Sequence, residues 1–361
     1  MSCYTAIALS GGIDSLVAAA LLKEQGHRLI GLHFLHGFET GQAGCPETGA
    51  DPVFAAVENH ARRTMQPLAD QLGIPLQVID LRAEFKRLVV DYFVKTYGIG
   101  KTPNPCLVCN PSIKFDLLLE KARAWGADRI ATGHYARIVP AEQGRLRLLR
   151  GVDKRKDQSY FLSRLSQSQL ANAVLPLGDQ TKEHTRRIAR RKGLIPANAT
   201  ESQDICFIKD VTYSDFLANQ PGFIFEPGPI QDMQGKLIGR HKGLHHFTIG
   251  QRRGINCPAP EPYYVVRIDH ERNCLIVGGK KDLAANSCQV SCINWITSRP
   301  ERRLSVMTRV RYRHKAVSST LIPTGDREAE IRFEVPEPAL TPGQGAVFYQ
   351  GDEVIGGGWI Q

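Results

Sequence analysis

The first 35 residues show the pattern of a strand, a helix and a second strand. The apolar run at residues 4–9 predicts a buried strand, and the two glycines after it predict a tight turn. Residues 15–25 place apolar side chains on one side of a helix that ends before Gly26, and residues 28–34 form the second apolar run. A helix between two such strands predicts a parallel pair joined by a right-handed crossover.

This alternation continues to about residue 155. Helical patterns at 53–73, 83–99 and 113–125 alternate with strand-like runs at 76–81 and 129–132. The pattern predicts an α/β fold built on an open parallel sheet.

The pattern changes after this region. Residues 160–200 are helical and basic, and residues 221–262, rich in Gly, Pro and His, are expected to be irregular. The last hundred residues hold short alternating runs separated by turns, which predict a small antiparallel β-barrel. These strand-like runs are 263–268, 274–277, 287–295, 304–312, 329–335 and 346–349.

These changes predict three domains. They are an α/β domain at residues 1–160, a small basic central domain at 161–225 and a C-terminal barrel domain at 226–361. No run approaches the 18 or more apolar residues of a membrane-spanning helix, and no basic region precedes the first apolar run. We therefore expect a cytoplasmic protein with no signal peptide and no membrane contact.

The 361 residues carry a formal net charge of +10, from 46 Lys and Arg against 36 Asp and Glu. Such an excess is typical of proteins that bind a polyanion, most commonly a nucleic acid. Basic segments at 145–156, 182–192 and 299–315 spread the charge over all three predicted domains. Each segment alone is typical of a solvated face, whereas the three together favour a long nucleic acid.

The strongest chemical signal is the sequence Ser-Gly-Gly-Ile-Asp-Ser at residues 10–15, between the first strand and the first helix. Glycines let the backbone approach a phosphate, which helix N–H groups and serine hydroxyls can bind. Asp14 can hold Mg²⁺. The Gly-Lys-Ser/Thr sequence of the Walker loop is absent here, which excludes a GTPase-type loop.

This loop resembles the pyrophosphate loop (PP-loop) of ATPases that adenylate a substrate. Further segments, in the same order along the chain, resemble the bacterial tRNA-specific 2-thiouridylase family, and the resemblance covers nearly the whole chain. These segments are 102–110 with 113–115, 131–135, 156–162, 201–208, 250–254 and 311–313.

The resemblance implies a sulfurtransferase with a PP-loop fold. ATP and Mg²⁺ would adenylate the C2 oxygen of the wobble uridine of tRNA, and sulfur transfer would then give 2-thiouridine, AMP and pyrophosphate. The implied partners are tRNAs for Lys, Glu and Gln, together with a sulfur donor protein or sulfide.

The resemblance also implies the site residues. ATP would bind at Ala8, Leu9, Ser10, Gly11, Gly12, Ile13, Asp14, Ser15, Phe34 and Gly133, with the adenine near the last two. Residue 34 is more commonly Met in the family. The implied tRNA contacts are Asn104, Pro105, Cys106, Lys156, Asp157, Gln158, Arg311 and Tyr312. Cys206 would carry a persulfide, and Cys109 would attack it, freeing sulfide or closing a disulfide between the two.

Cys106 departs from one form of the family, which has an acid–base Asp three residues before the catalytic cysteine. It makes a C-x-x-C pair with Cys109, and the nine cysteines of the chain favour catalysis, metal binding or redox chemistry over structural bridges. Three roles stay open: half of a zinc site, a redox dithiol, and a [4Fe–4S] cluster held by Cys106, Cys109 and Cys206. In the cluster, each of the three cysteines would ligate one iron, and the fourth iron would keep a free coordination position for sulfide.

The other cysteines and histidines are expected to play lesser roles. Cys3, Cys45, Cys257 and Cys274 are assigned to packing or exposure, and Cys288 and Cys292 are weak ligand candidates. His241, His245 and His246 are assigned to loop or RNA-facing positions.

Two other functions stay open. An amide-forming PP-loop synthetase is disfavoured because no glutaminase-like segment is visible and the cysteines would have no task. A nucleotide-binding RNA chaperone or sensor without turnover is the other.

Overall fold

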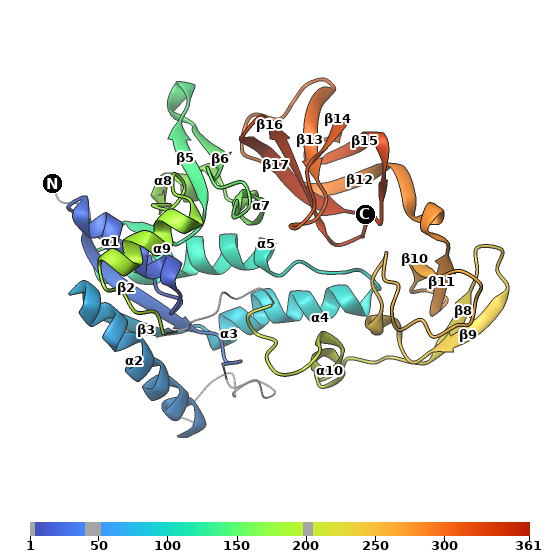
Figure 1. Cartoon of the computed structure of the whole chain (residues 1–361), viewed down its shortest axis with the longest axis horizontal. Coiled ribbons are helices and arrows are strands. Elements are labelled where there is room, and N and C mark those ends of the chain that lie inside the picture. Colours follow the sequence, from blue (N-terminus) through green and yellow to red (C-terminus); the bar gives the residue numbers. More distant parts are fainter. Residues whose placement is uncertain (1–3, 40–51, 198–204) are drawn as a thin grey trace. The chain divides into compact units, whose positions relative to one another are not determined.

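A computed structural model describes residues 4–39, 52–197 and 205–361, and its backbone divides into two compact units (Figure 1). The first unit comprises residues 1–89, 106–210 and 352–354, and the second comprises 90–105, 211–351 and 355–361. The predicted boundaries at residues 160 and 225 do not coincide with this division. Residues 106–210 join the N-terminal segment because their helices and strands share its sheet and its core.

The first unit is built on a five-stranded parallel sheet in the order β3-β2-β1-β4-β7. The strands are β1 (Tyr4–Ala8), β2 (Arg28–Leu35), β3 (Leu76–Asp80), β4 (Arg129–Ala131) and β7 (Ala173–Val174). From β1 the chain adds β2 and then β3 on one side of the sheet, and it later adds β4 and β7 on the other side of β1. The carboxyl ends of β1 and β4 therefore form the switch point at which open α/β sheets bind their ligands.

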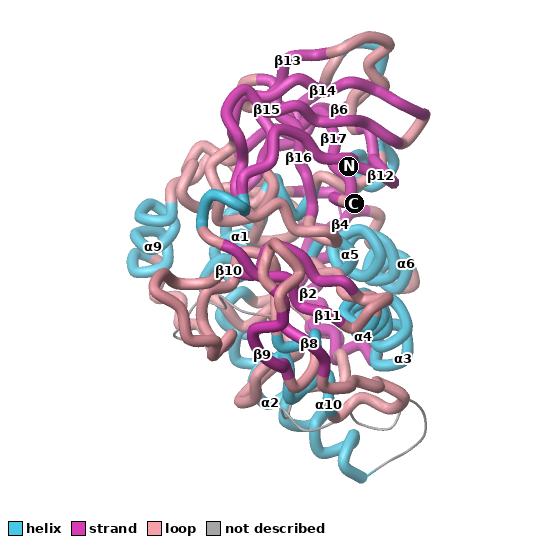
Figure 2. The backbone as a smooth tube through the Cα atoms, turned by 90° about the vertical axis from the view of Figure 1, so that its right-hand side faces the viewer, coloured by secondary structure: helices cyan, strands magenta, loops and turns pink. Residues whose placement is uncertain are grey.

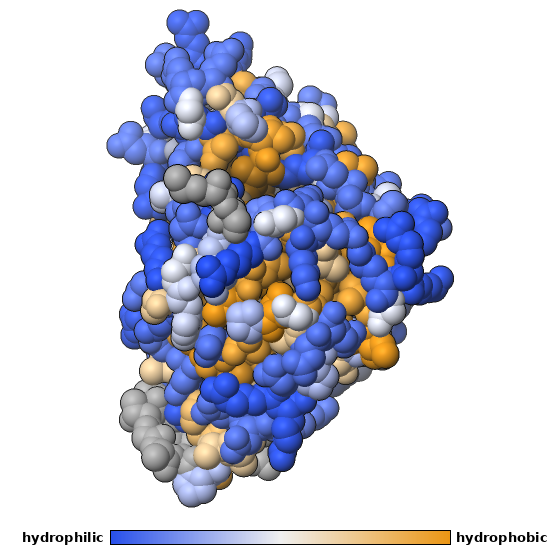
Figure 3. All heavy atoms as spheres, turned by 90° about the vertical axis from the view of Figure 1, so that its left-hand side faces the viewer, coloured by the Kyte–Doolittle hydropathy of each residue, from blue (hydrophilic) through white to orange (hydrophobic). Residues whose placement is uncertain are grey.

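Helices pack against both this sheet and one another. They are α1 (Ile13–Glu24), α2 (Pro52–Leu72), α3 (Arg82–Phe85), α5 (Cys106–Cys109), α6 (Leu118–Arg123), α7 (Ser159–Leu162), α8 (Gln167–Asn172) and α9 (Lys182–Arg191). Ile188 and Ala189 of α9 share one apolar core with Leu16 and Ala19 of α1. Figure 3 shows the side on which Figure 1 draws α1, α2 and α9, where hydrophilic residues surround an apolar area.

The proline-containing segment at residues 100–111 is partly helical. Cys106 opens α5, and a π-helical turn at Asn110–Leu117 continues it toward α6. Leu107, Ile113 and Phe115 are buried along this helical stretch, so apolar packing overrides the turn signals of its prolines. A hairpin of β5 (Ala136–Pro140) and β6 (Leu146–Arg150) completes the unit, and Leu149 pairs with Glu353.

The second unit contains α4 (Asp91–Gly98), α10 (Tyr213–Ala218), a small sheet and a barrel. The small sheet has the order β10-β11-β8-β9. Its strands are β8 (Gly228–Gln231), β9 (Leu237–His241), β10 (Tyr264–Asp269) and β11 (Cys274–Gly278). The prediction that residues 221–262 are irregular is therefore wrong for β8 and β9 and holds for most of the remaining residues. The runs at 263–268 and 274–277 belong to this sheet rather than to the barrel.

The predicted antiparallel barrel is confirmed, and it closes through six strands (Figure 2). They are β12 (Ala284–Trp295), β13 (Leu304–Arg309), β14 (Val317–Gly325), β15 (Glu328–Pro338), β16 (Gly345–Gln350) and β17 (Glu353–Ile360). Pairing of β12 with β17 closes the ring, which leaves no unpaired edge.

No helix in residues 4–39, 52–197 and 205–361 is long and apolar enough to span a membrane.

Candidate active site

The loop at residues 10–15 is tightly bent between β1 and α1. Gly11 has a φ of 84°, a conformation that favours glycine, and its carbonyl accepts a hydrogen bond from the Ala197 N–H at 3.0 Å. The Ser15 hydroxyl donates to the Gly12 carbonyl at 2.9 Å and accepts from the Ser10 N–H at 3.3 Å. Gly12 is the N-cap of α1 and has no side chain to occupy the first N–H groups of the helix, so these groups can bind an anion.

Gly133 touches this loop from the end of β4. A Cβ atom on Gly133 would lie 2.9 Å from the Asp14 carbonyl carbon and 3.0 Å from the Ser15 nitrogen. Since real Cβ contacts are almost never this short, only glycine lets β4 approach the loop so closely. The structure thus brings together two segments that the sequence separates by more than a hundred residues.

Phe34 lies at the end of β2, the neighbour of β1 on its other side, and its ring centroid is 6.4 Å from that of Phe85. The preceding residue, His33, contacts the residue just before the loop, because its Nδ1 lies 2.8 Å from the Leu9 carbonyl oxygen. The ten expected nucleotide-binding residues therefore all lie at the carboxyl ends of β1, β2 and β4 or in the first turn of α1.

Asp14 is held by a polar network that the sequence analysis missed. Lys182 Nζ lies 2.7 Å and 2.8 Å from its two carboxylate oxygens, and the Tyr135 hydroxyl donates to one of them at 2.8 Å. The Tyr135 hydroxyl also lies 3.0 Å from the Thr185 hydroxyl. The sequence places Lys182 in the basic run at 182–192, but its burial together with Thr185 and Ile188 puts it on the inner face of α9.

This network bears on the expected Mg²⁺ site. Both Asp14 oxygens contact the Lys182 ammonium group, which already compensates the charge of the carboxylate. Within the described residues, no group of three or more His, Cys, Asp or Glu side chains could hold a metal. The residues of the described chain therefore do not fit a metal ion held by the protein alone.

The three expected reactive cysteines all belong to the first unit. Cys106 is the first residue of the short helix α5 and Cys109 is its last. Cys109 is 8% exposed, whereas Cys206 is exposed to solvent. They do not form a metal-binding group in the structure, which disfavours the expected cluster. They are nevertheless close enough to interact electrostatically, because the charge of Cys106 raises the pKa of both Cys109 and Cys206.

Loss of hydration is the main influence on these thiols. It raises the pKa of the buried Cys109 to about 12, with smaller increases from the neighbouring thiols. Cys206 keeps part of its surface exposed, but the protein atoms packed around it still raise the pKa of its thiol to about 11. The Lys114 ammonium opposes this and lowers the pKa of all three thiols. Lys114 also lowers the pKa of His134, which burial already brings well below its usual range. His134 is therefore neutral at pH 7, and its Nδ1 lies 2.7 Å from the Thr132 hydroxyl.

Raised thiol pKa values predict slow alkylation near neutral pH. We expect the rate at which iodoacetamide modifies Cys206 to rise continuously from pH 7 to pH 10, because the thiolate fraction increases toward a pKa of about 11. Lys114→Met should slow the reaction at pH 8 by about threefold to tenfold, because the charge that lowers this pKa is lost. Peptide mass spectrometry would measure both rates. Lys121→Met, on α6, is the control, and equal rates for wild type and Lys114→Met would contradict this account.

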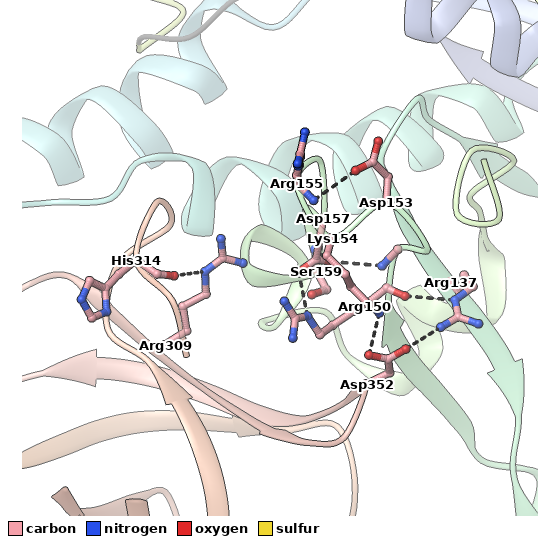
Figure 4. Close-up of polar contacts among 11 residues, drawn as sticks. Arg137, Arg150, Asp153, Lys154, Arg155, Asp157, Ser159, Arg309, His314 and Asp352 are labelled. Atoms are coloured by element: carbon pink, nitrogen blue, oxygen red, sulfur yellow. Dashed lines mark hydrogen bonds and ion pairs between the residues drawn. The ribbon is translucent and has the colours of Figure 1, made fainter. Parts of the chain in front are cut away.

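Residues 156–158 lie in the turn that leads into α7, where the side chains of Asp157 and Gln158 are hydrogen-bonded within the protein; Figure 4 labels Asp157. Asp157 is 1% exposed and accepts hydrogen bonds from the N–H groups of Gly151 and Ser159 and from Arg150. The Gln158 side chain accepts from the Tyr135 N–H at 3.0 Å. The burial of Asp157 differs from the expected direct contact with tRNA, and its carboxylate shapes the turn that carries Lys156.

Cationic side chains surround this turn within the first unit. Arg137 and Lys154 both contact the Asp352 carboxylate, at 3.1 Å and 2.6 Å, as Figure 4 shows. Lys154 and Arg155 remain exposed at the surface.

Arg311 and Tyr312 lie in the turn between β13 and β14 of the second unit, because β13 ends at Arg309 rather than at residue 312. The Arg309 guanidinium lies 5.2 Å from the Tyr312 ring centroid and donates to the His314 carbonyl at 3.0 Å. His314 is also 3.1 Å from the buried Glu337 carboxylate, whose pKa burial raises. These contacts fix the shape of a basic turn. In the same unit, the Asn104 N–H donates to the Tyr92 hydroxyl at 3.4 Å.

The remaining candidates are mostly packed inside the protein. Cys274 is buried as expected, and Cys288 lies in the barrel core. His241 and His245 are buried too, which rules out the RNA-facing alternative for both: His241 ends β9, and His245 lies in a short turn after it. Cys3 and Cys45 lie outside the described residues, as do residues 201–204 of the segment 201–208 that contains Cys206. All seven cysteines in the described part of the chain are free thiols.

Three family models match consecutive parts of the chain: the tRNA methyl transferase HUP domain at residues 4–210, the tRNA methyl transferase PRC-barrel domain at 214–279 and the aminomethyltransferase beta-barrel domain at 285–360.

Curated relatives match the chain over nearly its full length. A tRNA-specific 2-thiouridylase MnmA from Desulfosudis oleivorans is 47% identical, covering 99% of this chain and 94% of the relative. Proteins of the same name from Geobacter metallireducens and Moorella thermoacetica are 45% and 44% identical, each covering 98% of this chain and at least 95% of the relative.

Proposed function

The chain belongs to the tRNA-specific 2-thiouridylase family, and from this premise we propose that it replaces the C2 oxygen of the wobble uridine of tRNA by sulfur. ATP would adenylate that oxygen and release pyrophosphate, and the sulfur would then displace AMP. The activity is that of a tRNA-uridine 2-sulfurtransferase.

One observation carries this proposal. Gly133 contacts the loop at residues 10–15, and the charge of Lys114 lowers the pKa of the next residue, His134. The same Lys114 acts on Cys106, Cys109 and Cys206. A nucleotide-binding loop and a group of thiols are thereby linked within one unit, as a reaction that couples adenylation to sulfur transfer requires.

We propose a persulfide relay for the sulfur. A donor protein would transfer its outer persulfide sulfur to Cys206, which is exposed and therefore accessible to such a donor. The Cys109 thiolate would then attack the inner sulfur, closing a Cys109–Cys206 disulfide and expelling hydrosulfide. Hydrosulfide attacks the activated C2 carbon and AMP leaves, after which an external thiol reduces the disulfide. The relay needs no metal cluster, consistent with the absence of a three-ligand group in the described residues.

We propose that Mg²⁺ reaches the loop with ATP, as part of the nucleotide substrate. The tRNA partners would be those for Lys, Glu and Gln, and the compartment would be the cytoplasm, where tRNA and reducing thiols are available. Basic surfaces of each unit would bind the tRNA separately: Lys154, Arg155 and Lys156 in the first, and the turn of Arg311 and Tyr312 in the second.

The test of the activation step is pyrophosphate release measured with different acceptors. We expect release that depends on a tRNA with a wobble uridine and that falls to background with a tRNA carrying cytidine at that position. Release supported by ammonia and a small carboxylic acid in the absence of tRNA would instead identify an amide-forming synthetase.

Arg311→Ala should weaken tRNA binding by about tenfold at physiological salt and reduce the slope of log K against log salt by about one. The physical reason is the loss of one cation from the partly exposed turn between β13 and β14. Filter binding at several salt concentrations would measure it. Arg332→Ala is the matched control in the same barrel, because Glu330 already pairs with Arg332 at 2.9 Å. An unchanged slope in Arg311→Ala would contradict the assignment.

A further inference from the structure

Lys182, on α9, is a buried cation that lies beside the loop at residues 10–15. Its side chain is 6% exposed, and its ammonium group contacts both oxygens of Asp14, 168 residues away in the sequence. Its backbone N–H donates to Asp153, and Thr185, one turn along α9, faces the same network through Tyr135. Several contacts thus hold the ammonium group beside the first turn of α1.

Packing of α9 on α1 does not explain this placement. Ile188 and Ala189 already supply the apolar contact with α1. A second ion pair, between Lys192 and Glu24, joins the opposite ends of the same two helices at the protein surface. Because removing an ammonium group from water is costly, a buried ion pair is weak evidence for stability alone.

The position of the Lys182–Asp14 pair instead suits the binding of a polyphosphate. The loop offers backbone N–H groups at the start of α1 and the exposed Ser10 hydroxyl. A bare Asp14 carboxylate beside these donors would repel a phosphate group. Lys182 cancels that charge, and a preorganised cation also stabilises the negative charge that develops on a departing pyrophosphate.

We propose that Lys182 binds the β- and γ-phosphates of ATP, and that Asp14 is a positioning residue that holds the Lys182 ammonium group at the loop. This inference rests on the proposed function, since ATP is the nucleotide that it concerns. It assigns Lys182 to the nucleotide site rather than to the tRNA-binding surface predicted from the basic run at residues 182–192.

Equilibrium binding of ATP and AMP to the full chain tests the proposal. Lys182→Met should lower the affinity for ATP by about tenfold to a hundredfold, the range for lost hydrogen bonds to charged groups. Its affinity for AMP, which lacks the β- and γ-phosphates, should stay within about twofold of wild type. Lys192→Met removes the other α9–α1 ion pair and should change neither affinity.

The outcomes separate the possible roles of Lys182. If Lys182→Met weakens ATP and AMP equally, Lys182 is structural and the proposal is overturned. If that variant does not fold, Lys182→Arg keeps the charge and should retain the preference for ATP over AMP, and loss of affinity for both nucleotides would overturn the proposal. Wild-type protein that fails to bind ATP would refute the proposed function itself, before any variant is compared.

Discussion

Cys206→Ser is expected to abolish sulfur transfer to tRNA, by about a thousandfold or more, while pyrophosphate release continues. A serine hydroxyl cannot hold a sulfane sulfur, whereas the nucleotide loop at residues 10–15 is formed without Cys206. The thiolated nucleoside and pyrophosphate would be measured in the same reaction. Cys292→Ser, which changes another exposed cysteine in the barrel, is the matched control and should retain full thiolation.

The same variants distinguish a persulfide relay from an iron–sulfur cluster. After anaerobic reconstitution, a relay predicts no stoichiometric iron in the wild type, and Cys106→Asp should retain most activity. Iron bound by wild type and lost from the serine variants of Cys106, Cys109 and Cys206 alike would overturn the relay. Full thiolation by Cys206→Ser would remove Cys206 from the reaction altogether.

Asp14→Ala should reduce the rate of pyrophosphate release by about a hundredfold, comparable to the loss of a preorganised charge contact at an active site. The substitution leaves the buried Lys182 ammonium without the carboxylate that it contacts at 2.7 Å and removes an acceptor of the Tyr135 hydroxyl. A coupled assay of pyrophosphate would measure the rate, and filter binding would measure tRNA affinity, which should stay within about twofold of wild type.

The control for this substitution is Asp70→Ala on α2, where the carboxylate accepts a hydrogen bond from Gln66 of the same helix. It should release pyrophosphate at the wild-type rate. Normal release by Asp14→Ala would show that neither Asp14 nor its network serves the nucleotide.

Local patterns in the sequence predicted much of the first unit. Periodic apolar positions predicted α1, and apolar runs predicted β1 and β2, because these elements bury one face or both faces in a continuous core. The barrel followed from its alternating strands. The pattern did not reveal β8 and β9, whose short stretches contain Gly and Pro, or β17, which carries three consecutive glycines at residues 356–358.

The chemistry of the site was only partly predictable, because side-chain contacts depend on the tertiary fold. Residues 10–15 form a local motif and could be identified directly. In the sequence, Lys182 cannot be distinguished from the other basic residues of its run. Only the fold shows that α9 places its ammonium group against Asp14. Asp157 likewise could be placed inside its turn only from the bonds it accepts from Gly151 and Ser159.

Mass analysis of nucleosides from tRNA incubated with the protein, ATP and a sulfur donor tests the central claim most directly. The account predicts that one sulfur replaces one oxygen on a single uridine, at the wobble position, and that the gain requires ATP. A tRNA of unchanged mass after the protein has bound it and hydrolysed ATP would contradict the account.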